Sequence, residues 1–199
     1  MFHSNPASLA YDKLSKTGPL LKLYHSECFK NFLQQVLNLD SLYHLEDPVG
    51  SAYINICPNG SIINWHFDEV RIIRKAIGHI IFVLYQAVFT VTMMLQKPDA
   101  GGVFRKTKDK IRKKGAEDDD LYKKIEEIVT GADVKCLETQ IFEPGTLRIF
   151  NGSQCLHQVS KVEGEKDRLV VVFCYSNVPG VRNSPQVQEL FWGRSATPA

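Results

Sequence analysis

The sequence predicts one mainly β domain, a sandwich or barrel, with supporting helices at its N-terminal side. From residue 51 onwards, short runs rich in β-branched and aromatic residues alternate with turn residues, which is typical of such folds. Residues 20–42 instead place apolar side chains at helical spacing. The length of 199 residues suits a single domain with its own hydrophobic core. We expect an irregular N-terminal arm at residues 1–18 and one domain at residues 19–199.

The expected elements follow in order along the chain. Residues 20–42 predict one or two amphipathic helices that support a sheet. The candidate strands lie at residues 51–57, 62–68, 89–95, 134–142, 146–150, 156–159 and 169–175. Because Pro58-Asn59-Gly60 separates the first two of them, we expect these two strands to form a hairpin.

Residues 105–129 differ from the strands around them. A basic block is followed by an acidic block and then by a helical pattern at residues 121–129. We interpret this segment as a charged helical insertion between strands. A second interpretation, in which the basic block binds phosphate or an anionic substrate, stays open.

Composition excludes some classes of partner. With 24 basic and 22 acidic residues the formal net charge is +2, so no strong field points to nucleic acid, and no nucleic-acid partner is expected. The five cysteines are scattered and form no C-x-x-C pair, which favours a reducing compartment. No signal peptide is apparent at the N-terminus, so the expected location is the cytoplasm.

A candidate metal site is formed by His66, Asp68 and His157. His66 and Asp68 are separated by one residue, so on a strand both side chains point to the same face and can chelate one ion. His157 begins another expected strand much later. Two imidazoles and one carboxylate form a facial triad that leaves positions open for a chelating co-substrate and oxygen, a set that suits iron(II).

Arg168 is the candidate anchor for that co-substrate. It stands immediately before the apolar run at residues 169–175. A guanidinium there offers a rigid fork for a carboxylate, and it would bind the far end of a dicarboxylic acid chelated to iron. This arrangement fits 2-oxoglutarate.

These residues occur in an ordered series that resembles the 2-oxoglutarate/iron(II)-dependent oxygenase superfamily, in its prolyl hydroxylase-like branch. The matching positions are residues 51–55, His66-x-Asp68, Gly101-Gly102-Val103-Phe104, Pro144-Gly145-Thr146-Leu147, Phe150-x-Gly152, His157-x-Val159 and Arg168. The resemblance implies a double-stranded β-helix (jelly roll) and a dioxygenase, an oxidoreductase that converts 2-oxoglutarate to succinate and CO2.

The resemblance also implies the outcome of the reaction. Hydroxylation of a C–H bond is expected, with O2 as the oxidant, on a small molecule, an amino acid or a peptidyl substrate, and ascorbate is a possible further cofactor. Related halogenases leave the carboxylate position to a small residue so that chloride can bind iron. Because this chain keeps Asp68, halogenation is disfavoured.

Other residues are candidates for the pocket. Tyr53, or Thr90 and Thr92 on one face of their strand, can contact 2-oxoglutarate, although a buried tyrosine is equally a structural residue. Val170 stands where family members often carry a serine, so the second 2-oxoglutarate contact stays unassigned. Four aromatic residues are candidates for the pocket or the core: Trp65, Phe104, Phe142 and Trp192.

Residues 70–88 form an atypical insertion directly after the H-x-D motif. Family members commonly pass from this motif to the next strand within a few residues. We hypothesise that the segment is translated intron sequence, because Val70-Arg71 can be encoded by a donor-like GTAAGA and Tyr85-Gln86 by a pyrimidine followed by CAG. Transcript reads that span the segment with no spliced form would contradict this hypothesis.

Two alternatives treat the segment as genuine protein. Residues 76–95 have about the length of one bilayer span and follow three basic residues, which would make the chain a single-pass membrane protein. Thr90 and Thr92 argue against it by alternating like a strand. In the other alternative, the insertion disrupts the metal face and leaves a catalytically inactive jelly-roll binding module. The oligomeric state is not predicted.

Overall fold

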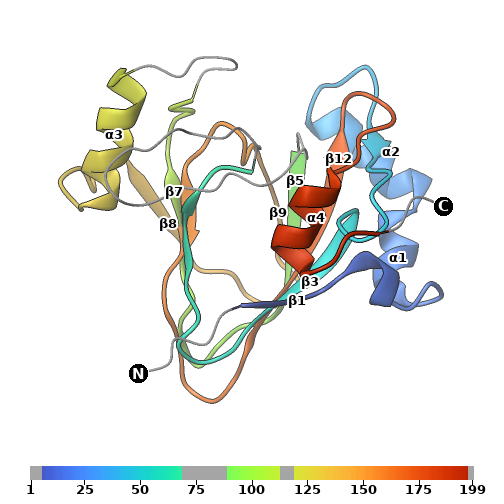
Figure 1. Cartoon of the computed structure of the whole chain (residues 1–199), viewed down its shortest axis with the longest axis horizontal. Coiled ribbons are helices and arrows are strands. Elements are labelled where there is room, and N and C mark those ends of the chain that lie inside the picture. Colours follow the sequence, from blue (N-terminus) through green and yellow to red (C-terminus); the bar gives the residue numbers. More distant parts are fainter. Residues whose placement is uncertain (1–5, 69–88, 113–118, 197–199) are drawn as a thin grey trace.

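The computed structural model describes residues 6–68, 89–112 and 119–196, and its architecture is two main antiparallel sheets with helices packed beside them (Figure 1). The larger sheet has the order β1-β3-β12-β5-β9, and β2 also pairs with β12. Its strands are β1 (Ala7–Leu9), β2 (Tyr43–His44), β3 (Ala52–Cys57), β5 (Phe89–Gln96), β9 (Leu147–Phe150) and β12 (Arg168–Ser176).

The smaller sheet has the order β4-β10-β7-β8. It consists of β4 (Ile63–His66), β7 (Phe104–Thr107), β8 (Leu137–Gln140) and β10 (His157–Val159). A short ribbon of β6 (Ala100–Gly101) and β11 (Val162–Glu163) completes the described strands. This arrangement confirms the predicted mainly β fold of the jelly-roll type.

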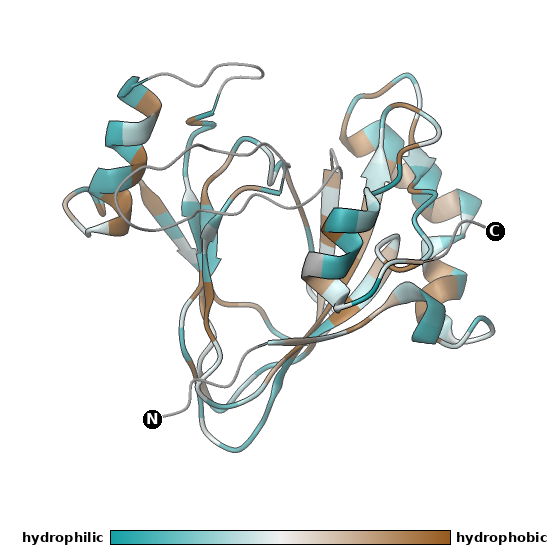
Figure 2. Ribbon diagram, in the orientation of Figure 1, coloured by the Kyte–Doolittle hydropathy of each residue, from teal (hydrophilic) through white to brown (hydrophobic). Residues whose placement is uncertain are grey.

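The N-terminal helices lie against the outer face of the larger sheet, as predicted. A 3-10 turn (Tyr11–Lys13) precedes α1 (Pro19–Tyr24) and α2 (Glu27–Val36). Their side chains Tyr24 and Leu33, which have no exposed surface, pack in one core cluster with Val91, Val171 and Phe173 of the sheet. Figure 2 shows hydrophobic colour along these strands and on the neighbouring helices. Burial of this face anchors β5 and β12, which position part of the site.

Helix α3 (Asp119–Val129) lies beside the smaller sheet, and α4 (Pro185–Trp192) lies near the larger one (Figure 1). Leu121, Ile125 and Ile128 of α3 share a core cluster with Phe67 and Leu156. The helix predicted at residues 121–129 is thereby confirmed. Residues 105–107, which the charge pattern places in the same insertion, are instead part of β7 inside the sheet.

The predicted hairpin of residues 51–57 and 62–68 is wrong. β3 has β1 on one side and β12 on the other, so neither edge is free for β4. The turn around Gly60, whose φ is +86° and whose N–H donates to the carbonyl of Val162 at 2.8 Å, carries the chain to the other sheet instead. There, β4 pairs with β10.

Other predicted segments differ in extent. The N-terminal arm, expected to be irregular, contributes β1, and the strand expected at residues 134–142 is limited to β8. The atypical insertion at residues 70–88 lies outside the described residues. Of the membrane span considered as an alternative at residues 76–95, the described part from Phe89 onwards is strand β5. Within the described ranges, no helix is long and apolar enough to cross a membrane.

Candidate metal centre

The pairing of β4 with β10 brings the two candidate histidines together. In this antiparallel pair His66 lies directly opposite His157, and their ring centroids are 4.1 Å apart. Asp68 follows β4, and its N–H donates to the carbonyl of Gly152 at 2.9 Å. Residues more than eighty positions apart in the sequence are therefore cross-strand neighbours.

The ligand atoms of these residues converge on one point. One atom each of His66, Asp68 and His157 lies within 4.8 Å of the other two. Oδ1 of Asp68 is 3.6 Å from Nε2 of His66 and 3.2 Å from Nε2 of His157. This is the donor set of a facial triad, which suits iron(II).

The three side chains are also hydrogen-bonded through the atom that faces away from this point. Nδ1 of His66 contacts the carbonyl of Asn64 at 2.7 Å, and Nδ1 of His157 contacts that of Cys155 at 2.9 Å. Because a carbonyl only accepts, each Nδ1 carries a proton, so in the neutral imidazole Nε2 is the atom whose lone pair can bind a metal. Thr90 donates its hydroxyl to Oδ2 of Asp68 at 2.8 Å, which leaves Oδ1 as the ligand atom.

The electrostatics favour the metal-binding protonation states. Desolvation, followed by repulsion from His157, lowers the pKa of His66 to about 4, so its imidazole is neutral at pH 7. Burial raises the pKa of Asp68, but His157, with His66 and the hydroxyl of Thr90, outweighs it and leaves this pKa well below the ordinary value. A neutral imidazole and an ionised carboxylate are the forms that bind a metal.

Gly152 makes room for the Asp68 carboxylate. A Cβ built on Gly152 would lie 1.7 Å from Oδ2 and 2.3 Å from Cγ of Asp68. No side chain fits at that distance, so the close approach requires glycine at this position. The Phe150-x-Gly152 motif therefore has a steric role in the centre.

A cavity of about 770 Å³ opens beside the triad and collects the other predicted residues. Tyr53, Thr92 and Arg168 all line it, as do the triad and the aromatic candidates Trp65 and Phe104. The aromatic candidates Phe142 and Trp192 instead pack against a core cluster of the larger sheet.

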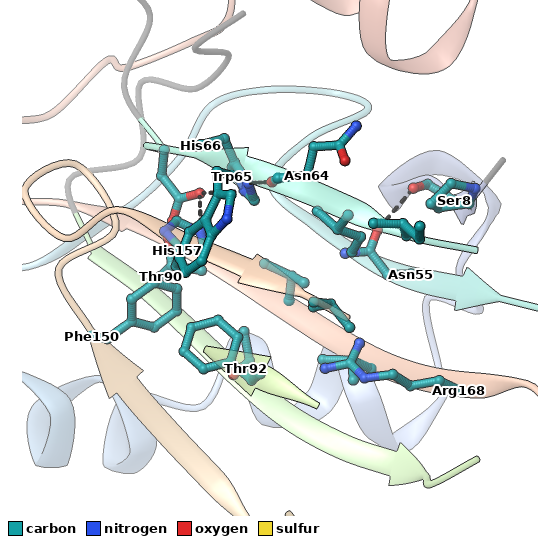
Figure 3. A pocket seen from close by; sticks show the side chains of 18 of the residues that line it. Ser8, Asn55, Asn64, Trp65, His66, Thr90, Thr92, Phe150, His157 and Arg168 are labelled. Atoms are coloured by element: carbon teal, nitrogen blue, oxygen red, sulfur yellow. Dashed lines mark hydrogen bonds and ion pairs between the residues drawn. The ribbon is translucent and has the colours of Figure 1, made fainter. Parts of the chain in front are cut away.

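Arg168 lies at the other end of this cavity from the histidines (Figure 3). Only 3 % of its surface is exposed, and its Nε donates to the carbonyl of Gly102 at 3.0 Å. Burial lowers the pKa of Arg168, while Cys57 opposes this shift. The hydrogen bond from Nε to Gly102 holds the guanidinium at a fixed position in the cavity.

Sequence reasoning missed Arg148, a second guanidinium in the same cavity. It lies on β9, where its register partner is Thr92. Strand alternation could have indicated Arg148 as a cavity residue. It lies two residues before Phe150 of the predicted motif, so on a strand the two side chains share a face.

The fold and this site define the chain as an oxidoreductase of the iron(II)- and 2-oxoglutarate-dependent oxygenase superfamily. Within it, the chain belongs to the family described as carrier-protein-independent halogenase WelO5, whose model matches residues 46–176. No curated protein sequence matches the chain.

Solved structures share the fold at low sequence identity. One is an oxidoreductase of the 2OG-Fe(II) oxygenase family from Burkholderia pseudomallei, with a TM-score of 0.55, 16 % identity and coverage of 88 % of this chain and 67 % of the other. HygX from Streptomyces hygroscopicus with iron bound has a TM-score of 0.56 and 15 % identity, with coverage of 85 % of this chain and 71 % of the other. HygX with nickel and 2-oxoglutarate bound has a TM-score of 0.56 and 15 % identity, with coverage of 86 % of this chain and 69 % of the other.

Proposed function

We propose that His66, Asp68 and His157 hold iron(II) and that the chain is an active dioxygenase. The observation that supports this most is the convergence of two Nε2 atoms and Oδ1 while each opposite atom is hydrogen-bonded. Such contacts fix both the tautomer of a histidine ligand and its orientation. Bound iron(II) supplies the activation of O2 that couples decarboxylation of 2-oxoglutarate to oxidation of a substrate.

Arg168 is the proposed anchor of 2-oxoglutarate. Its guanidinium pairs with the distal carboxylate while the 2-oxo acid end faces the metal. Tyr53 and Thr92 line the same cavity and are proposed as further contacts of the co-substrate. Burial raises the pKa of Tyr53 well above its usual value, so its hydroxyl keeps the proton that it can donate to a carboxylate.

The proposed outcome is hydroxylation, although the matching family model is described as a halogenase. A halide needs a coordination position that a side-chain carboxylate would otherwise take. Here Asp68 fills that position, and Thr90 and the backbone of Gly152 hold it there. Retention of the carboxylate therefore favours transfer of oxygen over transfer of a halide.

The substrate is proposed to be a small molecule, an amino acid or a peptidyl side chain. A cavity of about 770 Å³ has the size of a small-molecule site. HygX, one of the structural neighbours, has been crystallised with hygromycin B, which is consistent with a small-molecule substrate for this fold.

Succinate formation tests the proposed function. We expect the chain to form succinate from 2-oxoglutarate only with iron(II) and O2, and the His66→Ala variant to form none, because one of three protein ligands is lost. Arg168→Ala should mainly raise the 2-oxoglutarate requirement, by roughly 10- to 100-fold, because a charge-assisted bidentate pair is removed.

Four results would each contradict a part of the proposal. Succinate formation that persists in His66→Ala would exclude the assigned triad, and an unchanged 2-oxoglutarate requirement in Arg168→Ala would exclude the anchor. Absence of iron-dependent turnover in the wild-type chain would favour the inactive binding module. With chloride present, a turnover product that gains halogen instead of oxygen would refute the role assigned to Asp68.

A further inference from the structure

Arg148 is a cation inside the cavity with no ion-pair partner among the described residues. Its Nε and Nη1 are buried, and in the part of the chain that the structure describes neither has a hydrogen-bond partner. Within those same residues no ion pair involves Arg148, whereas Arg168 donates to Gly102. Buried hydrogen-bond donors normally have partners, so two open donors on one guanidinium point to a ligand.

Aromatic rings hold the Arg148 guanidinium in place. Its Cζ lies 3.3 Å from the ring centroid of Phe104, 4.6 Å from that of Phe142 and 4.7 Å from that of Phe150. Ring faces stabilise the cation but accept no hydrogen bond in the guanidinium plane. The N–H groups therefore remain available to an oxygen anion.

The guanidinium also lies near the metal centre. Phe150, which it contacts, is 4.9 Å from the ring of His157 by centroid distance. In the sheet register Arg148 is opposite Thr92. Thr90, two residues before Thr92 on the same face of β5, donates its hydroxyl to Asp68. An anion bound to Arg148 would consequently lie beside the reacting end of the cavity, on the edge strand β9, which β5 separates from β12 and Arg168.

The charges of the cavity leave one cation unbalanced. Its described charged residues are the two guanidiniums of Arg148 and Arg168 and the carboxylate of Asp68, because His66 and His157 bind a metal as neutral imidazoles. Iron(II) adds two positive charges and 2-oxoglutarate removes two. One positive charge then remains in a desolvated site, which is unfavourable without a further anion.

Burial, and then the charge of Arg168, lower the pKa of Arg148 to about 9. The guanidinium is therefore still a cation at neutral pH. The unbalanced charge persists in the conditions under which the enzyme works.

We propose that Arg148 binds a carboxylate of the primary substrate, so that the substrate is an organic acid. This inference rests on the proposed function, because the charge balance includes iron(II) and 2-oxoglutarate. It makes Arg148 the residue that selects the substrate, whereas Arg168 binds the co-substrate.

The test uses the full chain loaded with nickel(II) and saturated with 2-oxoglutarate, and it measures binding by calorimetry. The probes are 3-phenylpropanoate and the uncharged 3-phenylpropanamide, which have the same shape. We expect the acid to bind the wild-type chain about tenfold or more tightly than the amide. Arg148→Gln should abolish this preference, and Arg148→Lys should keep part of it, which separates loss of charge from misfolding.

A second titration distinguishes the source of the carboxylate. Arg168→Gln should weaken 2-oxoglutarate binding at least about tenfold more than Arg148→Gln does. Equal losses would overturn the inference, because Arg148 would then be a second 2-oxoglutarate anchor. Equal binding of acid and amide, or a preference that survives Arg148→Gln, would overturn it too. Failure of the nickel-loaded wild type to bind 2-oxoglutarate would instead overturn the proposed function.

Discussion

Each proposed metal ligand is positioned by hydrogen bonds made away from its proposed ligand atom. For both histidines the acceptor is the carbonyl two residues earlier in the chain, so the same local geometry is used twice. Asp68 depends on longer-range partners, the hydroxyl of Thr90 and the backbone of Gly152. The carboxylate is therefore the ligand that is most sensitive to substitutions elsewhere.

Substitution of Gly152 tests this sensitivity. Gly152→Ala would place a methyl group where the Asp68 carboxylate lies, and we expect metal affinity to fall roughly 10- to 100-fold as the ligand is displaced. Titration of nickel(II) followed by calorimetry measures the change. Gly145→Ala is the matched control. Its φ of +86° strains the backbone of an alanine, but a Cβ there meets nothing within 4 Å, so the Asp68 carboxylate is not displaced. Equal affinity of the two variants would contradict the steric role.

Some residues of the site could be predicted from the sequence, whereas the roles of others became visible only in the structure. Strand alternation was enough to place His66 and Asp68 on one face, and the donor set of a facial triad and the need for a carboxylate anchor indicated His157 and Arg168. The roles of Thr90, Gly152 and Arg148 depend on which strands pair and in which register. Since register is set by the whole sheet, a single strand pattern does not contain it.

At the scale of elements, turn chemistry did not determine which strands pair. The turn at Gly60 has the residues of a hairpin, yet both edges of β3 are occupied by other strands. The length of β12 decides this outcome, because it pairs with β3 over six consecutive positions. Long-range pairing of apolar strands therefore overrode a local signal.

A buried carboxylate fastens α4 to the loop before β3. Asp47 is 1 % exposed, and its Oδ1 accepts from the N–H groups of Val49 and Gly50 at 2.9 and 2.6 Å. Its Oδ2 accepts from the N–H of Asn183 at 2.8 Å and from Nε2 of Gln188 at 3.1 Å. Two segments far apart in the sequence thus share one acceptor.

Removal of this acceptor should destabilise the domain. We expect Asp47→Ala to lower the free energy of unfolding by about 3 kcal/mol, because buried donors lose their partner. Urea unfolding monitored by circular dichroism measures it. Asp40→Ala, at an exposed position, should change the value by less than about 0.5 kcal/mol. A similar loss in both variants would show that the Asp47 contacts contribute nothing specific.

At the scale of the whole molecule, the two sheets meet at the metal centre. β4 and β10 of the smaller sheet supply the histidines, and Thr90 on β5 of the larger sheet holds Asp68. The cavity is lined from both sheets, so its shape depends on how they pack. A connection between β4 and β5 must therefore allow the side chains of Asp68 and Thr90 to meet.

From that requirement we predict that the segment at residues 70–88 is dispensable for the metal centre. Asp68 and Thr90 are within hydrogen-bond distance, at 2.8 Å between Oδ2 and Oγ1. If residues 70–88 were deleted, Asp68 and Thr90 would be connected through Glu69 and Phe89 alone. This connection can span about 10 Å between the two Cα atoms, which is enough for the two short side chains to keep their hydrogen bond.

We therefore expect a variant lacking residues 70–88 to fold, to bind nickel(II) and 2-oxoglutarate at least as tightly as the full chain, and to form succinate with iron(II). Calorimetry and the succinate assay compare the two proteins, and the same deletion combined with His66→Ala controls for metal binding outside the triad. A deletion variant that folds but no longer binds the metal would show that the segment is needed to place Asp68. Equal or tighter binding would instead agree with the hypothesis that the segment is translated intron sequence, because the short connection alone would then complete the triad.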